Sequence, residues 1–455
     1  MRRLHFIPLL VLAACGGDTK CDPVAQTGCD NGMVCEEVTG TDPACFAAVE
    51  IDGKVIDLAT QQGIAGARIV AVDVNGTAQS NIVISGQDGT YKLPIPTQRN
   101  PDGTTVALAT VLLRADAVGY GPFPGTIRQP LPIDLGMATM TGSGYIFKSA
   151  QTDIGLLKLD AGGAGTIHGA VDLPDDHAGV LVVAESAGKG YSAIAARDGA
   201  YAILNLPAGH YAVTAYALGH VYTAAETDVA TSDVTLDLHL DATAATSVSG
   251  TVQIVNGGGA SATSIVLFVE STYDPVTGRG VQPSNFRAPG PGVAPNVTGA
   301  FTIDGIPPGH YVAVGAFEND GLVRDPDTCI SGTADVHITV VAGQPLAISQ
   351  GFKITGALAV MSPGATTAEM VTGNPTFTWA DDSGEDQYLV EVFDPFGQRI
   401  WMKTTPGVSG GMPSLAYDGN PALQPGAYYQ FRVTSSKNQC QLARTEDLRG
   451  VFYLP

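Results

Sequence analysis

The sequence lacks the patterns of a membrane-spanning or helical protein. No useful stretch has the 3.6-residue period of a helix, and after the N-terminal segment no apolar run approaches the roughly 18 residues that span a bilayer. Charged residues make up only 15% of the chain, and the 44 acidic residues outnumber the 23 Lys and Arg, for a formal net charge of -21. This balance excludes nucleic acid and anionic lipid surfaces as expected partners.

Motifs for catalysis are missing as well. None of the 8 histidines begins a His-Glu-x-x-His motif, which a zinc peptidase would need, and no phosphate loop or dinucleotide fingerprint follows a strand-like run. Gly407–Gly411 matches the Gly-x-Ser-x-Gly nucleophile elbow, but Met412-Pro413 stands where a helix should follow, and no histidine occurs after His337. We therefore expect no enzyme, no catalytic residue, no cofactor and no metal site.

Two groups of carboxylates raise the question of calcium binding. One group is Asp381, Asp382, Glu385 and Asp386, and the other is Asp320, Asp325 and Asp327. Calcium loops place acidic ligands at alternate positions in an Asp-x-Asp-x-Asp-Gly pattern, which neither group has in full. We interpret both groups as solvated loop acids, with calcium as the alternative.

Turn-forming residues are abundant instead. The 455 residues include 56 Gly and 29 Pro together with 44% hydrophobic residues. Such a composition is typical of short strands joined by many turns rather than of a disordered chain. A chain this long is expected to divide among several cores. We predict an all-β protein built of tandem β-sandwiches.

One phrase occurs twice, one hundred residues apart. Gly199-Ala200-Tyr201 runs on to Leu206–Val213, and Gly299-Ala300-Phe301 runs on to Ile306–Val314 with the same spacing. Apolar residues nearly alternate on both sides of a Pro-x-Gly-His turn, as they do in strands. We predict a strand, a tight turn and a strand that form a hairpin, with Gly209 at a positive φ.

The aromatic residues of the phrase are predicted to fill a sandwich core, and a ligand-stacking platform is the alternative. These aromatics are Tyr201, Tyr211, Phe301 and Tyr311. His210 and His310 follow the turn glycine, where we expect exposed imidazoles rather than ligands.

A shorter version of the phrase occurs at Asp88–Ile95, and a matching opening precedes all three. It consists of Gly-x-Val, a branched strand and Asp-Gly-x-Tyr or its equivalent, beginning at Gly53, Gly169 and Gly250. This order resembles the carboxypeptidase regulatory-like domain, a transthyretin-like β-sandwich, in three copies over about two thirds of the chain. The resemblance implies accessory modules without catalytic chemistry.

The N-terminus resembles a bacterial lipoprotein signal. A basic start and an apolar stretch from Leu4 to Leu12 lead to Leu12-Ala13-Ala14-Cys15, which is similar to the lipobox. The resemblance implies that Cys15 is lipidated and that the lipid is the membrane attachment. Gly16 in place of Asp implies transfer to the outer membrane or cell surface of a Gram-negative bacterium. A conventional signal peptide that leaves a free thiol at Cys15 is the alternative.

Six cysteines remain, an even number in an oxidising compartment. Cys21, Cys29, Cys35 and Cys45 crowd into a segment too short for a core, and their spacing lacks a zinc knuckle. We expect two disulfides there, with the three pairings left open. Cys329 and Cys440 are expected to pair, which joins the third sandwich to the last domain or ties two neighbouring loops.

The pattern changes after Gly356. Pro375–Trp379, Tyr388–Phe393 and a Leu423…Tyr429 pair resemble a fibronectin type III domain, in which Trp379 is the buried strand tryptophan and Tyr429 the tyrosine corner. The predicted segments are a signal peptide (1–14), a Cys-rich segment (15–47), three sandwiches (48–160, 161–242 and 243–355) and the fibronectin-like domain (356–455).

The third sandwich carries a Gly- and Pro-rich insertion, 273–295, which is the best sequence-based prediction of a binding edge. Tyr273, Phe286 and Arg287 are its predicted ligand contacts. The predicted function is a non-catalytic, surface-anchored adhesion, spacer or envelope scaffold protein, with the four modules in line and an envelope polysaccharide or surface protein as partner. The alternatives are a glycan-binding lipoprotein and an accessory subunit of a separate enzyme.

Overall fold

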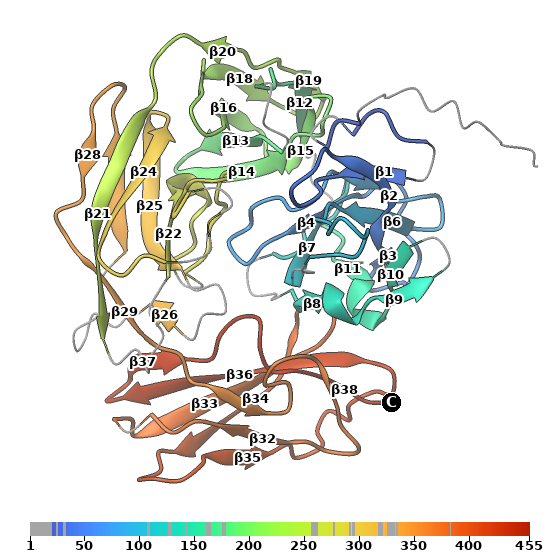
Figure 1. The fold of residues 1–455 in the computed structure, drawn as a ribbon, viewed down its shortest axis with the longest axis vertical. Coiled ribbons are helices and arrows are strands. Elements are labelled where there is room, and N and C mark those ends of the chain that lie inside the picture. Colours follow the sequence, from blue (N-terminus) through green and yellow to red (C-terminus); the bar gives the residue numbers. More distant parts are fainter. Residues whose placement is uncertain are drawn as a thin grey trace, which may run out of the picture.

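The protein consists almost entirely of β-strands (Figure 1). The computed structural model describes residues 21–455 apart from 24–25, 31–32, 107–109, 126–129, 142–143, 161–164, 175–178, 256–262, 276–277, 291–292, 294–295, 317–321, 325–332, 334 and 383. The predicted lipidation site Cys15 lies outside the described residues, as do Cys329, Asp320, Asp325 and Asp327. No helix in the described part of the chain is long and apolar enough to cross a membrane.

The Cys-rich segment forms a hairpin of β1 (Met33–Glu36) and β2 (Ala44–Ala47). Disulfides join Cys21 to Cys35 and Cys29 to Cys45. The hairpin is anchored on the first sandwich by the buried ion pair of Glu36 with Arg99. The Arg99 guanidinium also donates to the Ala47 carbonyl at 2.9 Å. Cys440 is disulfide-bonded too, and its partner lies outside the described residues.

Module 1 is the sandwich formed by the strands between Val49 and Leu156. Its elements are β3 (Val49–Asp57), β4 (Arg68–Val72), β5 (Val83–Ile84), β6 (Thr90–Ile95), β7 (Thr110–Asp116), β8 (Ile133–Asp134), η1 (Leu135–Met137), β9 (Thr139–Thr141), β10 (Gly144–Phe147), η2 (Ala150–Thr152) and β11 (Ile154–Leu156). One sheet has the order β11-β3-β10-β9 with β6 also on β3, and the other has the order β5-β4-β7-β8.

Module 2 is formed by the strands between Gly165 and Asp241. Its elements are β12 (Gly165–Ala170), β13 (Leu181–Ser186), β14 (Lys189–Ile194), β15 (Ala200–Leu206), β16 (Gly209–Tyr216), β17 (Val221–Tyr222), β18 (Ala225–Val229), β19 (Val234–Thr235) and β20 (Leu240–Asp241). The sheet orders are β15-β12-β19, β14-β13-β16-β18 and β17-β20.

Module 3 is formed by the strands between Thr246 and Gly356. Its elements are β21 (Thr246–Val255), β22 (Ser264–Val269), η3 (Glu270–Thr272), β23 (Arg287–Ala288), β24 (Ala300–Ile306), β25 (Gly309–Ala316), β26 (Leu322–Arg324), β27 (Val336–Val340), β28 (Leu346–Ala347) and β29 (Phe352–Gly356). One sheet has the order β24-β21-β29-β26 with β28 also on β21, and the other has the order β23-β22-β25-β27.

The repeated phrase is not a hairpin, and this prediction was wrong. β15 pairs with β12 while β16 pairs with β13 and β18, so the two strands belong to opposite sheets. Both strands turn their alternating apolar side chains into the core between the sheets, so they face each other instead of pairing. The positive φ lies at Asn205 (60°), and at Gly305 (78°) in module 3, not at Gly209.

The aromatic residues of the phrase do fill the cores, as predicted. Tyr201, Tyr211, Phe301 and Tyr311 are all at most 6% exposed. The Tyr211 hydroxyl donates to the Pro207 carbonyl at 2.7 Å, and Tyr311 donates to Pro307 at 2.9 Å. Each tyrosine thereby fixes the turn that precedes it.

Modules 1 and 2 each have a core of their own, and some of their residues also join the core of module 3 in one shared apolar interior. β4, β13 and β22 carry continuous branched runs that are buried on both faces, the pattern of strands covered on two sides. The contributing residues are Val70, Val72 and Leu112 of module 1, and Leu181, Val183, Ile194 and Tyr216 of module 2, packed with the core of module 3. Exposing such a side chain costs about 1.5–3 kcal/mol. The predicted in-line array is therefore wrong, and the modules close on one another (Figure 1).

The contact between modules 1 and 2 and the contact between modules 2 and 3 are made by equivalent residues of the repeated phrase. In module 2 the Asn205 side chain donates to the carbonyls of Ala117 and Tyr120 at 2.8 Å, and accepts from the Gly119 amide at 2.7 Å. In module 3 the equivalent residue, Gly305, accepts a bond from the Gly219 amide at 2.7 Å. The end of the first strand of the phrase, β15 or β24, thus contacts a glycine turn of the preceding module each time.

The C-terminal module has a separate core. Its strands are β30 (Val360–Ser362), β31 (Glu369–Met370), β32 (Thr376–Trp379), β33 (Gln387–Phe393), β34 (Arg399–Pro406), β35 (Ser414–Ala416), β36 (Tyr428–Lys437), β37 (Cys440–Arg444) and β38 (Val451–Tyr453). They form sheets β30-β32-β35 and β31-β38-β36-β33-β34, with β37 also on β36. Trp379 is fully buried, and the Tyr429 hydroxyl accepts a bond from the Gln424 amide at 2.8 Å.

Candidate functional site

The side chains of two of the three predicted ligand contacts, Phe286 and Tyr273, pack against other residues of the protein. Phe286 is fully buried in the shared interior, with its ring centroid 5.9 Å from that of Tyr311. Tyr273 stacks on Phe268 at 6.0 Å and donates from its hydroxyl to Asp335 at 2.8 Å. An exposed position for Phe286 was therefore a wrong expectation, because β23 pairs with β22 and turns the preceding aromatic ring into the core.

Arg287, the third predicted contact, holds its own loop together. Its guanidinium donates to the Ser264 hydroxyl at 3.0 Å and to the Pro289 carbonyl at 3.2 Å. The side chain is half-buried at the start of β22. Its contacts are those of a loop-stabilising residue, and ligand binding by Arg287 stays a prediction.

The insertion of module 3 instead contacts the C-terminal module. The Arg279 guanidinium lies 2.6 Å from one carboxylate oxygen of Asp447, and Arg432 lies 2.7 Å from the other. The Asp447 side chain is 6% exposed. Burial lowers the pKa of Arg432, while the charge of Asp447 opposes this shift. One buried carboxylate therefore joins two modules through two arginines.

The same insertion contacts module 1 on its other side. The backbone amide of Gln282 donates to the backbone carbonyl of Asn75 at 3.3 Å, and Val281 packs against the shared interior. Several buried side-chain atoms at this contact have no partner among the described residues: Nδ2 of Asn75, Oγ1 of Thr77, and both amide atoms of Gln282. A buried polar group without a partner costs about 1–3 kcal/mol, so this contact is less favourable than the fully bonded joint at Asn205.

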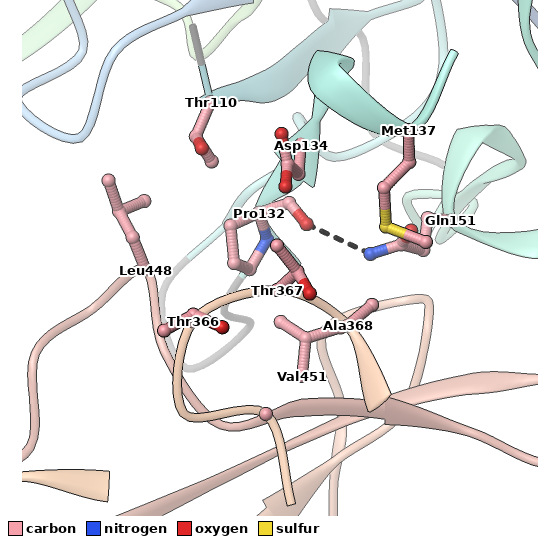
Figure 2. Close-up of a pocket in the computed structure, with 11 residues that line it drawn as sticks. Thr110, Pro132, Asp134, Met137, Gln151, Thr366, Thr367, Ala368, Leu448 and Val451 are labelled. Atoms are coloured by element: carbon pink, nitrogen blue, oxygen red, sulfur yellow. Dashed lines mark hydrogen bonds between the residues drawn. The ribbon is translucent and has the colours of Figure 1, made fainter. Parts of the chain in front are cut away.

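A small crevice lies between module 1 and the C-terminal module (Figure 2). Asp134, Met137 and Gln151 line one side, and the loop that carries Thr366 and Thr367 lines the other. The Gln151 amide is held by the Pro132 carbonyl at 2.9 Å. The crevice thus marks the place where the two modules meet. The hydrogen bond from Gln151 to Pro132 lies within module 1 and fixes that side of the crevice.

The carboxylates at 381–386 stabilise the C-terminal module itself. Asp381 accepts a bond from the Tyr388 hydroxyl at 3.0 Å, and Asp382 accepts one from Ser435 at 2.6 Å. Glu385 accepts from the Val408 amide, and Asp386 accepts from the Asn438 amide. These oxygens fix loops by bonding to hydroxyl and amide donors, and they do not converge on one point as calcium ligands do. Ser409 of the elbow-like motif lies in an exposed bend, without the strand-turn-helix that a nucleophile elbow needs.

Exposed histidines next to carboxylates lie on two equivalent sheet faces. In module 2, His210 Nδ1 lies 3.0 Å from Asp228 and its Nε2 lies 3.5 Å from Glu226. The hydrogen bond to Asp228 raises the pKa of His210. In module 3, His337 Nδ1 lies 2.6 Å from Glu270. Sequence reasoning missed His337 because its neighbours come from other strands and not from adjacent positions in the chain.

Comparison with known proteins gives no family for this chain. No family model matches the chain, and no curated protein does. Among solved structures, the chain is similar to a DUF3823 family protein from Bacteroides ovatus at 10% identity, with 46% of this chain and all of that one covered and a TM-score of 0.22. Two B repeat units of the Staphylococcus aureus collagen binding protein match at 11% identity, over 89% of this chain and 99% of that one, with a TM-score of 0.18.

A third similar structure is the minor pilin GBS52 of Streptococcus agalactiae, at 13% identity over 44% of this chain and 99% of that one, with a TM-score of 0.20. The TM-scores are low for all three structures. The all-β architecture of several sandwiches therefore rests on the strand pairing within this chain.

Proposed function

We propose that this protein is a non-catalytic lipoprotein of the bacterial envelope whose four β-sandwiches form one rigid block for adhesion or scaffolding. The observation that carries the proposal is the shared interior, which joins residues of three modules into one apolar core. A chain of independent modules would act as a flexible spacer, whereas a shared core holds the binding surfaces in fixed positions.

The proposal assigns the modules to families through their local structure. Modules 1 to 3 are carboxypeptidase regulatory-like sandwiches. In modules 1 and 2 this is supported by the turn of Asp-Gly-x-Tyr, in which Gly89 and Gly199 both have positive φ, and in module 3 by sheet pairing that matches module 2, with β24 on β21 and β25 on β22. The C-terminal module is fibronectin type III-like, supported by the buried Trp379 and by the bond that Tyr429 accepts from Gln424. In both families the fold serves as an accessory or binding module.

Anchoring through Cys15 and an outward-facing location on the outer membrane are part of the same proposal. They rest on the lipobox-like Leu12-Ala13-Ala14-Cys15 and on Gly16. Metabolic labelling with a palmitate analogue tests the anchor: the unchanged chain is expected to be labelled and membrane-bound, and Cys15→Ala to be unlabelled. Protease treatment of intact cells then distinguishes an outward-facing block from a periplasmic one.

Small-angle scattering tests the rigid block directly. A compact chain of this length has a radius of gyration of about 23 Å, whereas four modules in line would have a length on the order of 100 Å and a radius of gyration of roughly 30 Å. A large radius with a flexible profile would overturn the rigid-block proposal while leaving the lipid anchor standing.

Glycan binding is the second candidate function, and Tyr273 is the observation that favours it. Tyr273 is the only one of the two predicted aromatic contacts that is partly exposed. Co-sedimentation with peptidoglycan and with the cell's own surface polysaccharide tests it. Pelleting that Tyr273→Ala abolishes, and that the core change Phe286→Leu leaves intact, would favour glycan binding over a protein partner.

A further inference from the structure

The four cysteines of the N-terminal segment bring their sulfur atoms to one place. The Sγ atoms of Cys21, Cys29 and Cys45 all lie within 4.8 Å of one another. Cys29 and Cys45 form one disulfide, whereas Cys21 belongs to the other one and is bonded to Cys35. The two disulfides therefore lie side by side, and all four sulfurs are gathered in one cluster.

The register of the β1–β2 hairpin explains this clustering. Cys35 of β1 lies directly opposite Cys45 of β2, and the Cβ atoms of such cross-strand partners are about 4.5–5.5 Å apart on the same face. Cys21 and Cys29 precede the hairpin, and their Cα atoms lie 5.7 and 5.6 Å from those of Cys35 and Cys45. The sheet thus supplies a proximity that the spacing along the chain, which lacks a zinc knuckle, does not predict.

Hydrogen bonds hold the preceding loop on β1 in addition to the disulfides. The Gln26 side chain accepts a bond from the Cys35 amide at 3.0 Å, and it donates to the Cys35 carbonyl at 2.6 Å and to the Pro23 carbonyl at 2.8 Å. The Asp22 amide donates to the Thr27 carbonyl at 3.0 Å. These bonds favour the same backbone arrangement around the cysteines when the sulfur–sulfur bonds are open.

We propose that, in its reduced form with four thiols, this segment binds one thiophilic divalent metal ion such as Zn²⁺ through Cys21, Cys29, Cys35 and Cys45. A tetrahedral zinc site with Zn–S bonds of about 2.3 Å holds its sulfurs about 3.8 Å apart. Three of the sulfurs already lie within 4.8 Å of one another, so rotation of the cysteine side chains suffices to reach this geometry. Four thiolates close the coordination, so the ion has a structural role and holds the hairpin in place of the disulfides.

Reduction begins at the more accessible disulfide, because Cys29 and Cys45 are half-buried whereas Cys21 and Cys35 are buried. A dithiol reductant attacks this disulfide, which becomes two thiols while the dithiol becomes a disulfide. A freed thiolate within 4.8 Å of the Cys21 sulfur then attacks it and releases the Cys35 thiolate. A second dithiol reduces the disulfide formed in that step. The two dithiols thus supply four electrons and four protons, and zinc displaces these protons from the four thiols.

Titration of the reduced, full-length lipoprotein in detergent with Co²⁺ and then Zn²⁺ tests the proposal. Cys329 and Cys440 are both replaced by Ser, so that a phosphine reductant, removed under argon before the titration, leaves the clustered cysteines as the thiols. We expect one Co²⁺ per chain with the sulfur-to-metal charge-transfer absorption of a tetrathiolate site, and its displacement by one Zn²⁺. The same protein before reduction is the matched control and should show no such absorption.

Hydrogen exchange and two variants give further readouts. Exchange in β1 and β2, which reduction raises, should fall again when zinc is added, because metal binding is coupled to folding. Cys29→Ser and Cys45→Ser should each weaken zinc binding by more than the roughly 10–100-fold that losing an orienting partner costs. The proposal is overturned if the reduced chain shows no saturable binding up to about 10 μM zinc. It is also overturned if zinc binds while β1 and β2 stay unprotected, since an unfolded segment then holds the metal.

Discussion

Arg279, in the insertion of module 3, lies 2.6 Å from Asp447 of the C-terminal module, and this ion pair connects segments 168 residues apart. The same Asp447 carboxylate also holds Arg432 at 2.7 Å. The insertion thus makes an internal contact through Arg279, and its role as a binding edge stays a prediction. The insertion contacts Asp447 of the C-terminal module and Asn75 of module 1, and it therefore joins both modules to module 3.

Replacing Asp447 with Asn should loosen this contact. The change leaves Arg279 and Arg432 without their carboxylate, and removing one partner of a buried ion pair costs about 3–5 kcal/mol. Denaturant unfolding should show a loss of this size, with faster hydrogen exchange in 278–282. Arg399→Ala, which breaks an ion pair with Glu391 from a side chain that is 49% exposed, is the control and should cost at most about 1 kcal/mol. Equal effects from the two variants would contradict the role given to Asp447.

The joint between modules 1 and 2 should depend on the Asn205 side chain. Its three hydrogen bonds to module 1 contribute about 0.5–1.5 kcal/mol each. Asn205→Gly keeps the positive φ but loses these bonds, and we expect a loss of about 2–4 kcal/mol in unfolding free energy. Asn438 also has a positive φ but lies in an exposed turn, so Asn438→Gly should be nearly neutral. A neutral Asn205→Gly would show that the apolar interior alone holds the joint.

Reduction should unfold the Cys-rich hairpin and leave the sandwiches folded. Its disulfides close loops of 14 and 16 residues, and a loop of this size is stabilised by about 3 kcal/mol. The sandwich cores contain none of these cysteines. Mass spectrometry without reductant should recover Cys21 with Cys35 and Cys29 with Cys45, and any other pairing would contradict the structure. After reduction, hydrogen exchange should rise in β1 and β2, and near Cys440 in β37, whose disulfide is reduced as well.

The pKa of His210 should be raised above the ordinary value of a histidine. Its pKa is raised mainly by the hydrogen bond to Asp228, with smaller contributions from the Asp228 and Glu226 charges. Because the folded-state pKa is the higher one, the ion pair stabilises the fold below the unfolded-state pKa, and this contribution is lost as the pH rises through the folded-state pKa. NMR titration should show the raised pKa and its return toward the ordinary value in Asp228→Asn. An unchanged pKa in that variant would exclude Asp228 as the cause.

Local pattern in the sequence was enough to predict the strands and their cores. Alternating apolar residues and Gly-Pro turns determine which side chains face inward, because the period of a strand is a local property. Tyr211 was predicted in the core for this reason, whereas the burial of Trp379 was expected from the resemblance to a fibronectin type III domain, and both are buried. The even cysteine count likewise predicted a cross-linked N-terminal segment, although three pairings were open until the structure showed two disulfides.

Sheet pairing and module contacts were decided only by the tertiary structure. The strands around Pro207 read as a hairpin because alternation does not say which neighbour a strand bonds to, and they lie in opposite sheets. The branched run Val180–Ala184 predicted a strand, but only folding showed that its second face packs in the interior shared with module 3. Phe286 and His337 illustrate the same limit, since their surroundings come from strands distant in the chain. Sequence by itself therefore determined an all-β chain of repeated modules, and long-range packing determined that the modules form one block.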